Sequence, residues 1–276
     1  MAVETLTTTS RVVGGVTKVE ITETGAGRPI VFLHPGIGLR GAEPFLHKLG
    51  ALGRVIAPAH PGFSVLESSG FATVDDISYL YLSLLEELRE PAIVIGSSFG
   101  GWIALEVATK STASIAGLVL VDSVGVRFNT REVPDFADIY ALSTAELGKR
   151  LYHNPAIAQI DYVNTPASEL EIIARNREAE AHFSWSPYLH NPRLGMRLHR
   201  VNVPTLVVWG ESDGFAPPAY GRQLAGALPA ASFETIANAG HFPHIEQPDQ
   251  LVKHIGGFAA RLHDKLAVAQ KMELAR

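Results

Sequence analysis

The sequence lacks cysteine altogether, although it is 276 residues long. Without cysteine the chain cannot form disulfide bonds, offer a thiolate nucleophile or build a zinc site from thiolate ligands. Any nucleophile that this chain carries must therefore be an oxygen or a nitrogen atom.

Positively charged residues are also fewer than negatively charged ones, because the chain has 23 lysines and arginines and 28 aspartates and glutamates. The formal net charge is -5 and the isoelectric point is about 6.1. A chain of this balance has no basic surface for the phosphates of a nucleic acid or for an anionic membrane. We therefore expect a small-molecule substrate, with neither a nucleic acid nor a membrane as partner.

Long apolar runs are missing too, and no stretch approaches the roughly 18 uninterrupted apolar residues that indicate a membrane-spanning helix. Residues 1–10 contain neither the basic region nor the apolar region of a secretory signal peptide. We therefore expect a soluble, cytoplasmic protein. Because 46% of the residues are hydrophobic and only 18% are charged, the chain can bury a large core. The oligomeric state is left open, and a homodimer is compatible with the sequence.

What the sequence does contain is a series of short apolar runs rich in β-branched residues. After a strand-like segment at residues 12–22, these runs occupy residues 29–34, 54–59, 92–96 and 117–122. Helical patterns separate them. Strands that alternate with helices predict an α/β fold, in which helices cover both faces of a mostly parallel sheet.

This alternation stops after residue 122 and resumes at residues 204–209. The intervening residues show helical patterns that five prolines interrupt, at positions 134, 155, 166, 187 and 192. A segment of this length is too long for a loop. We therefore predict a helical cap at residues 126–200, inserted into a core formed by residues 1–125 and 201–276.

Residues 96–101 read Gly-Ser-Ser-Phe-Gly-Gly, directly after a predicted strand and directly before a helical pattern. A serine on so tight a strand-to-helix turn is strained, and Gly96 and Gly100 let the backbones approach closely. We expect Ser98 to be a nucleophile whose hydroxyl projects above the sheet. The N–H of Phe99, at the helix start, would stabilise an oxyanion. Taken alone, the motif is also compatible with an ordinary glycine-rich turn.

In this context the motif resembles the α/β-hydrolase superfamily, and in particular its capped members with a serine nucleophile. A second match lies at residues 32–38, Phe-Leu-His-Pro-Gly-Ile-Gly, which resemble the H-G-x-G oxyanion loop of the family. Pro35 replaces the usual first glycine, and proline has no N–H to donate. The resemblance therefore implies the N–H of Gly36 as the second oxyanion donor, with the N–H of Ile37 as the alternative.

Two more stretches match the same family. Residues 208–214 resemble its strand-end G-x-x-D motif, which implies that Asp213 accepts a hydrogen bond from the catalytic histidine. Residues 238–244 resemble its G-H motif, which implies that His241 is the general base. The serine, the aspartate and the histidine follow the family's chain order, and only the fold can bring such distant residues within reach. Asp122 is a rival acid, because it also ends a predicted strand.

The resemblance implies hydrolysis of a carboxylic ester or a similar acyl substrate through an acyl-enzyme, with no cofactor and no metal. The serine at position 98 argues against relatives that use an aspartate nucleophile. Two alternatives stay open. One is hydrolysis of a carbon–carbon bond in a vinylogous diketone from aromatic ring cleavage, which similar capped sequences carry out. The other is a ligand sensor that keeps the fold without turnover.

An apolar acyl or aryl part of the substrate requires a pocket lined by apolar side chains. The candidates are Ile37, Trp102 on the helix after the serine, and Trp185 of the cap. Aromatic residues of this kind more often form the core of a cap. Arginines of the cap could bind a substrate carboxylate, and they stand at positions 131, 175, 177, 193 and 197.

The histidines outside these motifs have structural interpretations. We expect His34 and His60 to support loops near the site. His244 lies three positions after His241, whereas metal-binding helices favour a spacing of four and a nearby carboxylate. We therefore predict no metal site.

Overall fold

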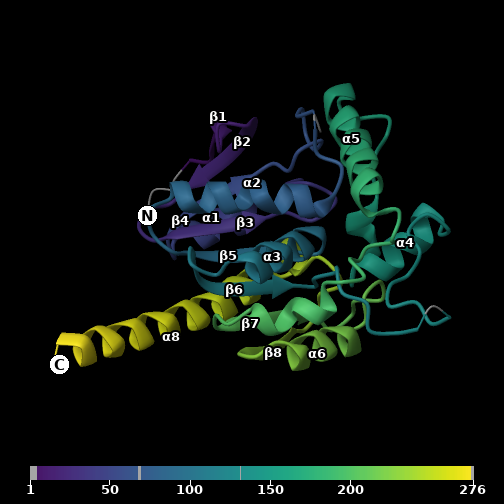
Figure 1. Ribbon diagram of the computed structural model, residues 1–276. Coiled ribbons are helices and arrows are strands. Elements are labelled where there is room, and N and C mark those ends of the chain that lie inside the picture. The colour runs from purple at the N-terminus through teal and green to yellow at the C-terminus, as the bar shows by residue number, and fades with distance from the viewer. Residues whose placement is uncertain (1–4, 68–69, 131, 275–276) are drawn as a thin grey trace.

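The structure, a computed structural model, describes residues 5–67, 70–130 and 132–274. Its centre is one sheet of eight strands (Figure 1). The strands are β1 Thr7–Val13, β2 Thr17–Thr24, β3 Pro29–Leu33, β4 Arg54–Pro58, β5 Ala92–Ser97, β6 Ile115–Val121, β7 Thr205–Gly210 and β8 Ala231–Ile236. Their order across the sheet is β1-β2-β4-β3-β5-β6-β7-β8.

Most of the sheet is parallel, as the alternation of strands and helices predicts. Strands β4, β3, β5, β6, β7 and β8 pair in parallel, whereas β1 pairs with β2 and β2 with β4 in antiparallel orientation. Parallel strands have their carboxyl ends at the same edge of a sheet, which is where α/β proteins place their sites. The residues that follow β5, β6 and β7 are therefore delivered to one place.

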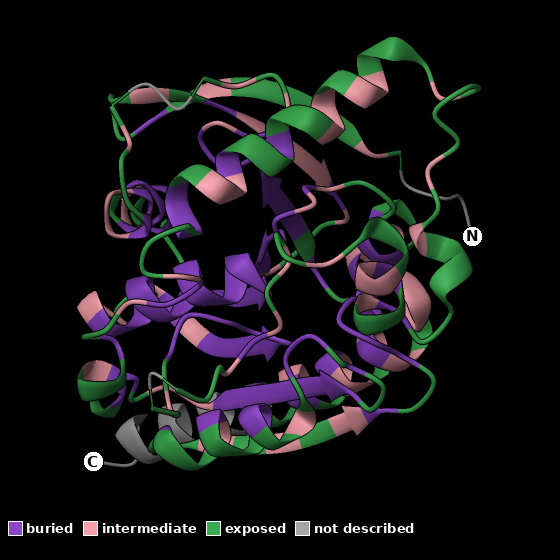
Figure 2. Ribbon diagram, turned by 90° about the vertical axis from the view of Figure 1, so that its right-hand side faces the viewer, coloured by how far each residue is buried: buried purple, intermediate pink, exposed green. Residues whose placement is uncertain are grey.

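Helices cover both faces of this sheet. They are α1 Glu43–Gly50, α2 Val74–Glu87, α3 Phe99–Lys110, α6 Pro218–Ala227, α7 Pro243–Glu246 and α8 Pro248–Leu274. α1 and α8 contribute to the apolar core on one face, and α2, α3 and α6 to the core on the other. Every residue of β3 and β5 is consequently buried (Figure 2), which explains why these strands are continuously apolar instead of alternating.

The prediction of one strand at residues 12–22 is wrong, because this segment contains a turn. β1 and β2 form an antiparallel hairpin in which Val13 pairs with Thr17. Gly14 and Gly15 lie between them with φ angles of 61° and 68°. These left-handed conformations favour glycine and close the hairpin.

The residues between β6 and β7 form helices α4 Thr144–Leu151 and α5 Ala167–Ser184 and the short 3₁₀ helices η1 Pro155–Ala158 and η2 Gly195–Arg200. α4 and α5 lie beside the edge of the sheet to which the carboxyl ends of the strands point (Figure 1). Two of the predicted proline breaks coincide with helix starts, since Pro155 begins η1 and Pro166 precedes α5. The division into a core and a cap at residues 126–200 stays a prediction.

Polar contacts fasten α5 to the loops of the sheet. The side chain of Asn176 donates to the carbonyl oxygen of Ile37 at 3.0 Å and accepts from the N–H of Ser64 at 2.8 Å. Arg40 forms an ion pair of 3.1 Å with Glu169 near the start of α5. These contacts fix the position of α5 over the loop that follows β3.

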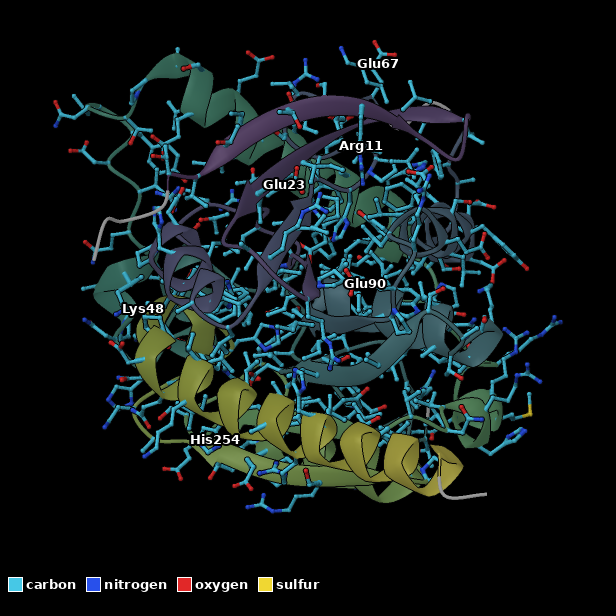
Figure 3. All side chains as sticks on the ribbon, turned by 90° about the vertical axis from the view of Figure 1, so that its left-hand side faces the viewer. Arg11, Glu23, Lys48, Glu67, Glu90 and His254 are labelled. Atoms are coloured by element: carbon cyan, nitrogen blue, oxygen red, sulfur yellow. The ribbon has the colours of Figure 1, made fainter. Side chains whose placement is uncertain are left out.

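On the opposite side of the molecule, α8 packs along the sheet. Phe258 and Leu262 lie against Gly117 of β6, where even a Cβ atom would come within 2.9 Å of both side chains. Lys48 of α1 lies beside the first turns of α8 (Figure 3), and its Nζ forms an ion pair of 2.7 Å with Asp249. Within the described ranges, no helix is both long and apolar enough to cross a membrane.

Candidate active site

Ser98 stands on the turn between β5 and α3, in a strained backbone conformation with φ 50° and ψ -114°. The turn is tight enough to exclude side chains on both sides. A Cβ on Gly96 would lie 2.5 Å from the carbonyl oxygen of Gly100, and a Cβ on Gly100 would lie 2.0 Å from that of Leu33. The two glycines are therefore a steric requirement of this turn, which holds the serine at the edge of the sheet.

Three side chains that are distant in the sequence meet at this edge. The Oγ of Ser98 and the Nε2 of His241 lie 2.7 Å apart, and the Nδ1 of His241 lies 2.7 Å from the Oδ2 of Asp213. All three residues are buried. The structure thus brings together the serine, the histidine and the aspartate that the motifs single out.

The hydrogen bonds define which nitrogen of His241 carries the proton. The Oδ1 of Asp213 accepts from the backbone N–H groups of Phe215 and Ala216, at 2.9 and 3.0 Å. A carboxylate that accepts on both oxygens needs the Nδ1 of His241 to be the donor. The Nε2 of His241 is then free to accept the proton of Ser98, which is the tautomer of a general base.

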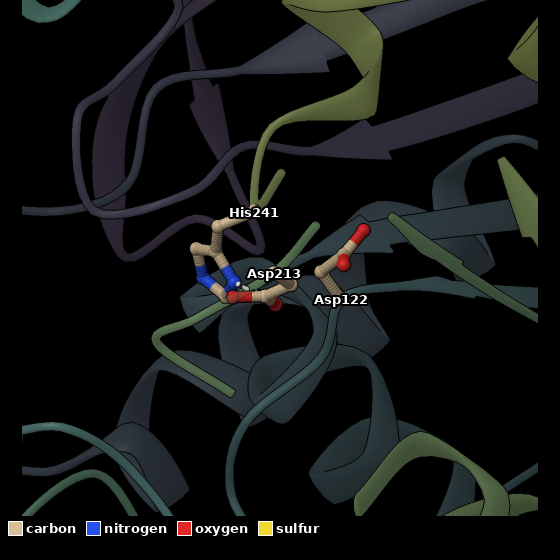
Figure 4. Close-up of side chains that lie close together, drawn as sticks. All are labelled: Asp122, Asp213 and His241. Atoms are coloured by element: carbon tan, nitrogen blue, oxygen red, sulfur yellow. Dashed lines mark hydrogen bonds and ion pairs between the residues drawn. The ribbon is translucent and has the colours of Figure 1, made fainter. Parts of the chain in front are cut away.

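Asp122, the rival acid, lies on the far side of Asp213 from His241 (Figure 4). Its Oδ1 accepts from the N–H of Gly210 at 2.9 Å, and its Oδ2 has no hydrogen-bond partner within the described residues. Burial, followed by the charge of Asp213, raises the pKa of Asp122 well above its usual range. Asp122 therefore stands behind the aspartate that contacts the histidine, and its carboxyl group holds a proton more readily than an ordinary aspartate does.

The loop after β3 is held by two buried histidines. The Nδ1 of His34 donates to the carbonyl oxygen of Pro35 at 2.7 Å, and its Nε2 accepts from the N–H of His60 at 3.0 Å. The Nε2 of His60 donates to the carbonyl oxygen of His34 at 2.9 Å, so its Nδ1 accepts from the hydroxyl of Tyr81. Burial lowers the pKa of His34 to about 4 and that of His60 well below its usual value. Both imidazole rings are therefore neutral, and their hydrogen bonds hold the loop in place.

This loop places Gly36 at the site. Neither the N–H of Gly36 nor the N–H of Phe99 donates a hydrogen bond to another described residue. Phe99 is the first residue of α3, where N–H groups have no partner within the helix and the dipole favours negative charge. The two groups are available as donors to an oxyanion. The N–H of Ile37 is equally without a partner in the described part of the chain, so the choice between Gly36 and Ile37 stays a prediction.

Ser98 and His241 open into a cavity of about 400 Å³. Its walls are mainly apolar and come from α4, α5 and the loops around them. The apolar residues are Ile37, Ile139, Leu142, Leu147, Leu151, Ala158, Ile160, Ile173, Phe215 and Phe242. Besides Ser98 and His241, the polar residues are Arg40, Tyr140, Thr144, Tyr152, Asn176, Arg177 and Glu180.

The predicted pocket residues divide between the inside and the outside of this cavity. Ile37 lines it, but the predictions for Trp102 and Trp185 are wrong. Trp102 is buried in the core beneath the site, where its Nε1 donates to Glu106 at 3.3 Å. Trp185 is 61% exposed and packs on the outer side of Tyr140. Among the cap arginines Arg177 lines the cavity, whereas Arg131 lies outside the described residues.

The family model of the alpha/beta hydrolase family matches residues 30–254 of this chain. The chain belongs to the alpha/beta hydrolase family. Its relatives include the 2-hydroxymuconate semialdehyde hydrolase of Pseudomonas sp. strain CF600, which is 28% identical over 86% of this chain and 89% of the relative. The shared family makes this protein a hydrolase, and it leaves the substrate to be inferred from the site.

Solved structures share the fold of this hydrolase. A thermophilic esterase from Thermogutta terrifontis superposes with a TM-score of 0.69 at 22% identity, over 93% of this chain and 99% of the esterase. A meta-cleavage product hydrolase from Pseudomonas fluorescens IP01 superposes with a TM-score of 0.69 at 20% identity, over 92% of this chain and 97% of that one. The fold is therefore shared by enzymes named for ester hydrolysis and for ring-cleavage products.

Helix α4 of this hydrolase supports His241 directly and Asp213 through its neighbour Gly214. The carbonyl oxygen of Leu151, at the end of α4, accepts from the N–H of His241 at 2.7 Å. The preceding carbonyl oxygen, of Arg150, accepts from the N–H of Gly214 at 2.9 Å, next to Asp213. The segment between β6 and β7 thus helps to build the site as well as to cover it.

Glu180 is a site residue of the hydrolase that the motifs do not indicate. It projects from α5 into the cavity, and burial raises the pKa of its carboxyl group to about 7, although the charge of Arg177 and that of a protonated His241 act to lower it. No local signal distinguishes Glu180 from the other acidic residues of α5, because the feature that matters is its contact with a loop far away in the sequence.

His244 lies in an aromatic cluster of the core. It packs against Phe32, Phe45 and Phe242, and neither ring nitrogen has a hydrogen-bond partner among the described residues. Burial lowers the pKa of His244 to about 3. The described side chains that come close enough to share an ion are instead Asp122, Asp213 and His241. There, both nitrogens of His241 already serve the hydrogen bonds of the triad.

Proposed function

We propose that this protein is a serine hydrolase that cleaves a carboxylic ester or a similar acyl substrate through an acyl-enzyme. The observation that carries the proposal is the continuous hydrogen-bonded chain from Ser98 through His241 to Asp213. In this role Ser98 is the nucleophile, His241 the general base and acid, and Asp213 the carboxylate that orients the imidazole.

The geometry supports the following sequence of steps. The Oγ of Ser98 attacks the carbonyl carbon of the substrate while its proton passes to the Nε2 of His241. The carbonyl oxygen becomes an oxyanion, to which the N–H groups of Gly36 and Phe99 donate. His241 then gives its proton to the leaving group as the bond to that group breaks. A water molecule, deprotonated by His241, releases the acyl group and restores the serine.

The cavity supports a substrate with an apolar acyl or aryl part. Leucines, isoleucines and two phenylalanines line most of the space in front of Ser98. An apolar group that binds there removes this surface from water, which is favourable for binding. The volume of about 400 Å³ suits a small organic molecule and not a polymer. We therefore propose a small-molecule acyl compound as the substrate class.

A second candidate is hydrolysis of a carbon–carbon bond in a vinylogous diketone. Two observations favour it: the name of the Pseudomonas relative, and Arg177 at the cavity, which can bind a carboxylate. In this reaction the same serine would attack the ketone carbonyl while its proton passes to His241. The carbon–carbon bond would then break, and the carbanion that leaves would take up that proton from His241.

Activity-based labelling combined with a substrate panel tests both candidates. A fluorophosphonate probe should label Ser98 in the native protein and leave Ser98→Ala unlabelled, and peptide mapping would locate the label. The panel contains aryl esters of graded chain length and one ring-cleavage dienoate. Faster Ser98-dependent turnover of the esters supports the first candidate, and faster turnover of the dienoate supports the second. Labelling without turnover of any substrate would favour a ligand sensor.

A further inference from the structure

The carboxyl group of Glu180 lies directly against Gly36. An ideal Cβ on Gly36 would lie 1.9 Å from the Oε1, 2.1 Å from the Cδ and 2.5 Å from the Oε2 of Glu180. The whole carboxyl group therefore occupies the space over the glycine whose N–H is the proposed oxyanion donor. Ser98 and His241 line the same cavity as Glu180.

In the part of the chain that the structure describes, this carboxyl group has no hydrogen-bond partner. The carbonyl oxygen of Glu180 accepts from the hydroxyl of Ser184 at 2.6 Å, as expected within a helix. Among the described residues, however, no donor is hydrogen-bonded to the carboxyl oxygens of Glu180. The side chain is partly accessible from the cavity. An unpartnered polar group at the wall of a substrate cavity is placed to bind a group of the substrate.

The charged and titratable groups around Glu180 do little to hold it ionised. Arg177 is on the same helix but is exposed, so water screens its charge. Tyr140 and Tyr188 approach from the segments before α4 and after α5, and both are neutral at physiological pH. His241 faces the carboxyl group across the cavity, and Arg40 is already paired with Glu169. The apolar wall therefore dominates, which agrees with a pKa of about 7 for Glu180.

We propose that Glu180 is a further catalytic residue of this hydrolase: in its protonated form it donates a hydrogen bond to the substrate's carbonyl oxygen as that oxygen becomes negative. The proposal rests on the proposed function. A protonated carboxyl group over Gly36 would add a third donor to the N–H groups of Gly36 and Phe99. An ionised carboxylate in the same place would repel the oxyanion and compete for those donors.

The proposal predicts that kcat/KM falls with pH above about pH 7. It falls as Glu180 loses its proton, by up to about tenfold for each further pH unit. With a non-ionisable ester as substrate, the falling limb reports on the protein.

Replacing the ionisable group without changing its shape tests this prediction. Glu180→Gln keeps an N–H donor at the same place but cannot ionise. We expect this variant to lose the falling limb, so that kcat/KM stays level between pH 7 and pH 9. Glu178→Gln, an exposed position on the same helix, is the matched control and should keep the falling limb. Glu180→Ala removes the donor and should lower kcat at least about tenfold at pH 6, with a smaller change in KM.

Several outcomes would overturn the role of Glu180. A falling limb that persists in Glu180→Gln, or that the unaltered protein lacks, would show that ionisation of Glu180 does not limit the rate. A preference for esters that carry a cation, lost in Glu180→Gln, would show that the ionised form is the working one. In each case Ser98-dependent hydrolysis would still stand, whereas no Ser98-dependent hydrolysis at any pH would overturn the proposed function itself.

Discussion

The backbone N–H of His241 donates a hydrogen bond of 2.7 Å to the carbonyl oxygen of Leu151. One residue belongs to the loop after β8 and the other ends α4, so two segments distant in the sequence meet at the imidazole. A catalytic histidine must be held within a fraction of an ångström of its partners for efficient proton transfer. The end of α4 is therefore part of what positions His241.

A substitution next to His241 should reveal this support. A Cβ on Gly240 would lie 2.4 Å from the carbonyl oxygen of Leu151 and 2.8 Å from the Cα of Tyr152, so the backbone must move to make room. We expect Gly240→Ala to lower kcat by about 10- to 100-fold, since small misplacements of catalytic groups are costly. Steady-state kinetics on an activated ester would measure the effect.

Gly226→Ala is the control for this change. Gly226 is exposed on α6, and a Cβ there would have no atom within 4 Å. Alanine in a helix is favoured over glycine by about 0.5–1 kcal/mol, so this variant should keep its activity and its stability. Equal activity in the two variants would mean that contact with α4 does not position the histidine.

The two aspartates near His241 should respond very differently to replacement by asparagine. Asp213→Asn should lower kcat by at least about 10³-fold, because an amide no longer stabilises the imidazolium or selects the tautomer. Asp122→Asn should lower kcat by less than about tenfold, because this carboxyl group does not contact His241, burial already disfavours its charged form, and its Oδ1 can be replaced by the amide oxygen. Larger loss of kcat in the Asp122 variant would reverse the assignment of the acid.

His244 offers a prediction on stability. Its ring lies among three phenylalanines with no hydrogen bond to a described residue, so His244→Leu should at pH 7.5 match or exceed the unaltered protein in free energy of unfolding. The unfolded chain binds a proton near pH 6.5, whereas the folded chain holds His244 neutral down to about pH 3. Stability is therefore lost as the pH falls below 6.5.

The leucine variant should escape this loss. Its advantage over the unaltered protein should grow by up to about 1.4 kcal/mol for each pH unit below 6.5. Urea denaturation at pH 7.5, 6 and 5 would measure the free energy of unfolding. Parallel pH dependence in the two proteins would show that His244 is not held neutral by the fold.

The size of the cavity should set the length of the acyl group that is accepted. Ile173 of α5 lines the cavity, and Ile173→Trp would fill part of it. We expect kcat/KM for long-chain aryl esters to fall by about 10- to 200-fold, with acetate esters less affected, because a few methylene groups are worth this much in a pocket. Val163→Trp, at a site 90% exposed and outside the cavity, should leave the chain-length profile unchanged.

Much of the fold follows from local patterns in the sequence. The runs at residues 29–34, 54–59 and 92–96 are apolar because both faces of the sheet are covered, and each became a strand. The hairpin of β1 and β2 was harder to predict, because the sequence of two strands joined by a turn with two glycines resembles that of one interrupted strand. Short motifs at the carboxyl ends of strands likewise placed Ser98 and Asp213, because the turn and the strand end impose local requirements on residue type.

The lining of the cavity could not be predicted in the same way. Nearly every residue of α3 is buried, so the helical pattern does not say which side of it Trp102 faces. Trp185 ends α5 and turns outward, which depends on the path of the chain after that helix. Glu180 is positioned by the packing of α5 on a loop about 140 residues earlier in the sequence, and local sequence contains no trace of that contact.

The fit between Gly36 and Glu180 links the two positions in protein engineering. Any side chain at position 36 would have to displace the carboxyl group of Glu180, so a library that varies position 36 alone should also lose the donor that Glu180 supplies. Varying both positions together admits solutions in which a larger residue at 36 is matched by a smaller one at 180. Laboratory evolution of new substrate preferences should therefore recover changes at these two sites as pairs.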